Sequence, residues 1–288
     1  GYALQQLSRL AHADGLLTPD TPEGTGRTLR RTAQLLKWAS FERGRTLMSH
    51  FMGLSQQEKA LELLRLAAAR KDFDPAEARG TLEPLLSARD QGLPPLSRAL
   101  EGERVSILDL CEGMVDGRKD LSPAIVRYTG TGWYRPFVHE NALRVLDHFD
   151  ALDRLCGEEP HRAAAEMQRL EAELTAARKK NNPLTMGMGL VPDLRSTFRE
   201  QIRMTVELRL ARLALAALER RQKTGTWPEK LDDLAPMFPQ GIPLDPFTGK
   251  PFLYENTATG ACLASAEADA LDKKGSSKEA EKLRWDLK

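Results

Sequence analysis

The chain has 288 residues, of which 41% are hydrophobic, and this is enough to bury a sizeable core in one large domain or two smaller ones. Its 42 Lys and Arg residues balance 41 Asp and Glu residues, which argues against a nucleic-acid partner because such binding needs a basic surface. No stretch of the sequence reaches the roughly 18 consecutive apolar residues of a membrane-spanning helix.

The start of the sequence favours a further segment upstream. Residue 1 is Gly rather than Met, and the stretch YALQQLSRLAH that follows it already has the pattern of a helix. A single leading Gly is a common remnant of tag cleavage. We therefore expect a membrane anchor or a signal peptide ahead of it, although a trimmed disordered tail would leave the same sequence.

The first part of the chain has the spacing of packed helices. Apolar residues recur at helical intervals between residues 29 and 69, which predicts a helical hairpin. Within it, Ser55 and Glu58 have the capping-box pattern, which predicts a helix start at Ser55. Asp74 before Pro75 predicts the cap and the first position of the next helix. Another helix is predicted in PLSRALEGERVSILDLCEGMVDG, so we expect antiparallel helices stacked in chain order.

The middle of the chain continues this pattern after a predicted loop. The loop is expected at residues 122–136, where Gly and Pro residues concentrate. Residues 139–156 and 161–180 predict a second helical hairpin, with Pro160 at the start of its second helix. Residues 181–193 place apolar side chains between two prolines and predict a buried connection or a contact loop.

A long helix is predicted next, over residues 194–223, and it is the expected spine of the fold. One of its faces is apolar, with Ile202, Val206, Leu210, Leu213 and Ala217 at helical spacing. After it, six prolines exclude long helices and central strands, so residues 229–234 form at most two helical turns. Residues 251–255 and 261–264 predict a β-hairpin, and residues 283–287 predict a third strand.

These elements predict a mainly α protein with two parts. Residues 1–193 form an antiparallel helical array of helical hairpins that is partly tetratricopeptide-like. Residues 194–288 form the long spine helix and a small antiparallel β module packed against it. Stacked hairpins create a groove wide enough for a peptide or a helix, so the array predicts a binding face.

The C-terminal part resembles the C-terminal half of the type II secretion major pseudopilin, in which a long helix runs into a turn and then a hairpin. The resemblance covers residues 204–288 and is carried by Gly225, Trp227, Pro228, Asp245, Pro246, Gly249, Pro251 and Tyr254. It implies a pseudopilin-like α+β module. The chain departs from that family because some 200 residues of helices stand where the pseudopilin has its assembly-driving hydrophobic helix, which argues against pilus building in the pseudopilin manner.

A second resemblance covers most of the chain. LRRTAQLLKWASFERG, ALEGERVSILDL, GWYRP and LRWDL resemble an uncharacterised group of envelope-associated proteins of planctomycete, verrucomicrobial and myxobacterial type. Those proteins commonly carry an N-terminal membrane segment. The resemblance therefore implies a periplasmic or envelope-associated location through an N-terminal anchor or signal peptide, and it implies no activity.

One candidate metal site follows from the pseudopilin resemblance, since the loop after the pseudopilin hairpin binds calcium. The corresponding stretch here is SAEADALDKKG, in which Glu267, Asp269 and Asp272 would supply three carboxylates. Alanines at the expected glycine positions and two following lysines favour a solvated acidic turn instead. No cofactor is predicted.

Two further sets of residues bear on chemistry. His139, Glu140, Asp147 and His148 are candidates for a metal or acid–base site, although a helix places His139 and Asp147 only roughly on one face. The three cysteines, Cys111, Cys156 and Cys262, lack metal-ligand spacing and are predicted to be free buried thiols. Trp227 and Trp285 are expected in the core.

The leading functional hypothesis is a non-enzymatic, envelope-associated protein that binds or scaffolds a protein partner, with a link to secretion or surface assembly. Two alternatives stay open: a hydrolase-type or metal-dependent enzyme that uses the region of His139, Glu140 and His148, and a small-molecule sensor. No catalytic residue is assigned.

Overall fold

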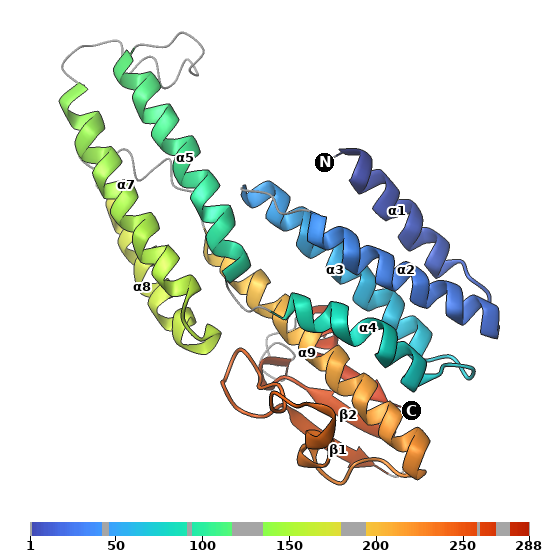
Figure 1. Ribbon diagram of the computed structural model, residues 1–288. Coiled ribbons are helices and arrows are strands. Elements are labelled where there is room, and N and C mark those ends of the chain that lie inside the picture. Colours follow the sequence, from blue (N-terminus) through green and yellow to red (C-terminus); the bar gives the residue numbers. More distant parts are fainter. Residues whose placement is uncertain are drawn as a thin grey trace. The chain divides into compact units, whose positions relative to one another are not determined.

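The computed structural model describes residues 2–41, 46–90, 94–116, 135–179, 194–257, 260–268 and 277–287. As predicted, the described chain is mainly helical and ends in a small three-stranded antiparallel sheet (Figure 1). The α-helices are α1 (Tyr2–Leu16), α2 (Pro22–Phe41), α3 (Leu47–Ala68), α4 (Pro75–Arg89), α5 (Pro94–Asp116), α7 (Arg135–Cys156), α8 (Pro160–Lys179), α9 (Arg195–Thr224) and α11 (Ser277–Lys282). A 3₁₀ helix, η3 (Leu231–Met237), precedes strands β1 (Leu253–Thr257), β2 (Gly260–Ala264) and β3 (Arg284–Leu287).

The chain forms two compact units. Unit 1 comprises Gly1–Arg43, Phe51–Gly92 and Gln201–Lys288, and unit 2 comprises Gly44–His50 and Leu93–Glu200. The boundary predicted between residues 193 and 194 does not coincide with this division, because unit 1 joins the first helices of the chain to its C-terminal module. Helical periodicity identifies each helix but does not say which helices share a core.

The core of unit 1 is built around α9. The five residues of its predicted apolar face are all buried, which confirms that face. Met204, Leu208 and Leu215, on other sides of the helix, are buried as well, because residues from α2, α3, α4 and the sheet join the same hydrophobic cluster. A helix covered on nearly all sides is a core helix rather than a surface one.

Two predictions about helix starts have opposite outcomes. Asp74 caps α4 as predicted, accepting hydrogen bonds from the backbone N–H groups of Ala76 and Glu77. The predicted start at Ser55 is wrong, since α3 begins at Leu47 and Ser55 lies inside it. The helix is capped near its actual start, where the backbone N–H of Ser49 donates to the Thr46 hydroxyl at 3.3 Å. The motif at Ser55 therefore has no helix end to cap.

The sheet has the strand order β1-β2-β3, and both strand pairs are antiparallel. Its three strands confirm the predicted hairpin and third strand. Leu263 pairs with Trp285 across β2 and β3, and both side chains are buried in the cluster that contains α9. Arg65 of α3 lies over the Trp285 ring, 4.5 Å from its centroid. The module is therefore fixed to the helices by apolar packing and a cation–π contact.

Unit 2 contains α5 packed against α7 and α7 packed against α8. Only three residues separate α7 from α8, and Pro160 is the first residue of α8, which confirms the predicted helix start. Arg104 of α5 forms an ion pair with Asp150 of α7, at 2.7 Å. The predicted connection at 181–193 and all but the last two residues of the predicted loop at 122–136 lie outside the described residues.

Candidate functional site

The four residues of the predicted metal or acid–base site all lie on α7 but do not come together. His139 and Asp147 are exposed, whereas His148 is buried. His139 and His148 are nine residues apart, which places them on opposite sides of a helix. Glu140 forms an ion pair with Arg144 one turn later, at 3.0 Å. The arrangement offers no shared centre for a water molecule or a metal ion.

His139 instead lies at a pocket between α5 and α7, with a volume of about 280 Å³. The pocket is lined by Leu108, Cys111, Glu112, Val115, Asp116, Val138, His139 and Ala142. Burial raises the pKa of the Cys111 thiol, so the thiol stays protonated at neutral pH and is a weak nucleophile. Cys156 is buried too, and Cys262 is half-buried; all three thiols are free.

The predicted calcium loop is described only at its beginning. Glu267 is half-buried, and its backbone N–H donates to the Ser265 hydroxyl at 3.2 Å. Asp269 and Asp272 lie outside the described residues. Within the described part of the chain, no three His, Cys, Asp or Glu side chains are placed to hold a metal ion. The calcium site stays a prediction.

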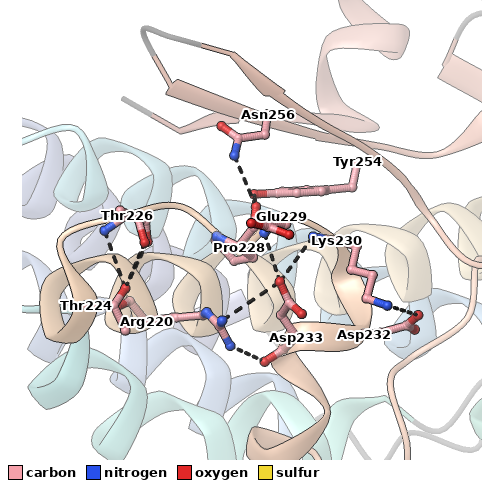
Figure 2. A network of polar contacts seen from close by, with 10 residues as sticks. All are labelled: Arg220, Thr224, Thr226, Pro228, Glu229, Lys230, Asp232, Asp233, Tyr254 and Asn256. Carbon is pink, nitrogen blue, oxygen red and sulfur yellow. Dashed lines mark hydrogen bonds and ion pairs between the residues drawn. The ribbon is translucent and has the colours of Figure 1, made fainter.

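The turn that follows α9 is held by a dense polar network (Figure 2). Gly225 ends the helix in the left-handed region, with φ of 77°, a conformation that glycine adopts without strain. The Asp233 carboxylate then accepts hydrogen bonds from the backbone N–H groups of Glu229 and Lys230, at 2.8 and 3.3 Å. Arg220 of α9 lies 3.8 Å from the same carboxylate. These contacts tie η3 to the end of α9.

The opposite side of this turn is tied to β1. The carbonyl oxygen of Pro228 accepts hydrogen bonds from the Tyr254 hydroxyl, at 2.8 Å, and from the Asn256 amide, at 3.2 Å (Figure 2). Burial raises the pKa of Tyr254 to about 12, so its hydroxyl remains a donor at every physiological pH. Trp227 packs against the core under a cation–π contact with Arg221. The network is a structural joint that fixes the module.

A second polar cluster lies between α3, α9 and the C-terminal residues. Glu207 of α9 is 3% exposed and pairs with Arg203 one turn earlier. Arg203 also lies 3.7 Å from Glu58 of α3, and Glu58 pairs with Lys282. Burial raises the pKa of Glu207 to about 7, although Arg203, Arg65 and Lys282 act against this effect. The cluster therefore holds a carboxyl group that titrates near neutral pH.

The least expected feature is the orientation of α1. Its inward face carries small residues: Ser8 and Ala11 are buried, and Gly15 is so close to α3 that an added Cβ would lie 2.7 Å from the Leu63 side chain. Small residues let α1 pack closely on its neighbours, as it does along α2 (Figure 1). His12 of α1 also contacts Glu62 of α3, at 2.9 Å. The helix is thus firmly held without burying its large apolar side chains.

Those large side chains point outward. Leu7 and Leu10 are 51% and 67% exposed, and Leu17, which directly follows α1 and still donates its backbone N–H to Ala13, is 85% exposed. Together with the exposed Ala3 they recur at spacings of four, three and seven residues, which marks one helix face, and we call these four residues the α1 stripe. Single exposed leucines are common, whereas an apolar row on one helix indicates an interaction surface. Sequence reasoning missed it, because leucines at helical spacing normally mark the core side.

None of the described helices is both long enough and apolar enough to cross a membrane. Comparison with known proteins adds no relative: no family model, no curated protein and no solved structure matches the chain.

Proposed function

We propose that this chain is a non-enzymatic, envelope-associated protein that binds or scaffolds another protein through the α1 stripe. The observation that carries the proposal is the inverted packing of α1, which buries Ser8, Ala11 and Gly15 and leaves Leu7 and Leu10 in solvent. Exposing a leucine row forgoes the free energy that burial provides, on the order of 1.5–3 kcal/mol for each fully buried side chain. A partner that covers the row recovers this free energy.

The envelope location and the link to secretion or surface assembly rest on the two resemblances. The turn residues that resemble the pseudopilin, among them Gly225, Pro228, Asp245 and Tyr254, are the ones that hold the module together in contacts of this chain. In this proposal the pseudopilin-like module is a rigid end to the spine helix α9, and the helical hairpins, partly tetratricopeptide-like, present the binding surface. An N-terminal anchor or signal peptide places the protein in the periplasm.

The test is copurification of the full-length protein from its native envelope fraction after mild crosslinking, in wild-type form and as a Leu7→Ser, Leu10→Ser double variant. The matched control is Val105→Ser with Leu143→Ser, two apolar residues that are 61% and 59% exposed in unit 2. We expect one protein at stoichiometric level with the wild type and the control, and a loss of about tenfold or more with the α1 variant. Equal recovery with both double variants, or no stoichiometric partner at all, would contradict the proposal.

A further inference from the structure

A basic hollow lies beside the α1 stripe. Arg27, Arg30, Arg31 and Gln34 of α2 recur at the spacing of one helix face, and together with Asp14 of α1 they line a hollow of about 640 Å³. Three guanidinium groups and one carboxylate thus line one concave surface. Guanidinium groups bind carboxylates through paired hydrogen bonds. The hollow therefore suits additional acidic side chains.

Asp14 shows that a carboxylate fits this position. Arg31 donates a hydrogen bond from Nε to Asp14 at 2.7 Å, and Arg27 lies 4.0 Å from the same carboxylate. The hydrogen bond from Arg31 holds the pKa of Asp14 below its ordinary value. Arg31 also donates to the Gln34 side chain at 2.8 Å, which fixes the direction of its guanidinium group. Arg30 is exposed on the same face and extends the basic row.

The hollow and the α1 stripe form one continuous surface, because Asp14 lines the hollow and lies between two residues of the stripe. Asp14 lies four residues after Leu10 and three before Leu17, so its side chain emerges within the row of leucines. Its contacts with Arg31 and Arg27 then join that row to the basic face of α2. The combined surface is an apolar row with an arginine row along one flank.

We propose that this surface docks an amphipathic helix of a partner protein whose apolar face covers the α1 stripe and whose acidic flank enters the hollow. The inference rests on the proposed function and names the chemistry of the partner. A helix presents apolar anchors at intervals of three, four and seven residues, which matches the spacing of Leu7, Leu10 and Leu17. Acidic residues of the partner helix that lie one or two positions from its apolar anchors in the sequence would then contact Arg27, Arg30 and Arg31.

Charge argues against the obvious alternative, a second copy of this chain. In a symmetric dimer whose two leucine rows pack antiparallel, the arginine rows would face each other across the interface. Juxtaposed like charges oppose association. A partner of opposite charge is attracted from a distance and held in register by the same arginines.

The experiment uses two synthetic helical peptides of about 18 residues, which carry identical leucine rows and either Glu or Lys along one flank. Each peptide is labelled and titrated with the full-length protein, and binding is followed by fluorescence anisotropy. We expect the Glu peptide to bind about tenfold or more tightly than the Lys peptide. Its affinity should fall between about 50 mM and about 500 mM NaCl, because salt screens exposed charges.

Two variants locate the binding. Arg30→Glu should weaken the affinity for the Glu peptide about tenfold or more. The matched control Arg98→Glu, which changes an exposed arginine of α5, should leave this affinity unchanged.

Vesicles of phosphatidylglycerol test whether the surface binds a lipid membrane instead. Equal affinity for both peptides overturns the proposal, and so does vesicle binding that depends on Arg30 when the Glu peptide does not bind. If the copurified partner is lost with the Leu7 and Leu10 variant but kept with Arg30→Glu, the acidic partner is overturned while the proposed function stands.

Discussion

Replacement of Asp245 by alanine is expected to lower the free energy of unfolding by about 3–5 kcal/mol, a large fraction of the total for a protein of this kind. The Asp245 side chain is fully buried and accepts three hydrogen bonds. They come from the backbone N–H of Phe247 at 2.9 Å, the Ser265 hydroxyl at 2.9 Å and the backbone N–H of Ala266 at 3.1 Å. Alanine would leave the buried Ser265 hydroxyl and two partly buried N–H groups without this acceptor, at a cost of about 1–3 kcal/mol for each donor that stays unpaired.

The loss reaches beyond one turn, because Asp245 joins the loop before β1 to the residues after β2. Unfolding in urea, analysed by linear extrapolation, measures the effect. Asp245→Asn keeps one acceptor oxygen and should lose about half as much stability. The matched control, Asp232→Ala, removes a carboxylate whose side chain is 80% exposed and should change stability by less than about 0.5 kcal/mol. If Asp245→Ala lowers the free energy of unfolding as little as the control does, Asp245 does not stabilise the C-terminal module.

Between pH 5 and pH 8, the free energy of unfolding of the Glu207→Gln variant is expected to rise relative to that of the wild type, by about 3 kcal/mol at most. This limit follows from the difference between the folded and unfolded pKa values, since each pKa unit corresponds to about 1.4 kcal/mol. The ordinary pKa is 4.5, and burial raises it to about 7 in the folded chain. Between these values the folded chain holds a proton that the unfolded chain has released. Raising the pH through this window therefore destabilises the wild type, whereas a glutamine side chain does not titrate.

The measurement is a series of urea unfolding curves at pH 5, 6, 7 and 8 for the wild type and the variant. Glu219→Gln is the matched control, because Glu219 lies on the same helix and is nearly buried, but Lys223 and Arg79 lower its pKa. Its difference from the wild type should stay constant over this pH range. If Glu207→Gln instead loses stability as the pH rises, pairing with Arg203, Arg65 and Lys282 outweighs burial and the predicted titration is wrong.

Local features of the sequence were sufficient to predict most elements of the fold. Asp74 with Pro75 and the proline at position 160 mark helix starts through interactions within a few residues. The strands were found because turn residues bound them on both sides. In contrast, the grouping of α9 with α2, α3 and α4 depends on contacts between residues more than one hundred positions apart, which periodicity does not encode. The predicted helix start at Ser55 was wrong for a related reason. The capping-box motif concerns only Ser55 and the residues after it, so it does not show whether the preceding residues are already helical.

The candidate binding surface could be predicted only in part. The leucines of α1 are visible in the sequence, but their spacing is the same for a core face and for an exposed one. The deciding fact is that Ser8, Ala11 and Gly15 occupy the inner face, and this depends on how closely α2 and α3 approach. The arginines of α2 are likewise visible at helical spacing, yet only the contact between Arg31 and Asp14 places them beside the leucines.

The most direct test of the central claim is site-specific crosslinking in living cells that produce the full-length protein with a photoreactive amino acid at position 10, or at position 143 as the control. Both positions carry exposed leucines, in α1 and α7 respectively. We expect one dominant crosslinked partner protein from position 10 and none from position 143. Crosslinks of equal yield from both positions, or no protein crosslink from position 10, would contradict the claim that α1 is the surface through which this protein binds its partner.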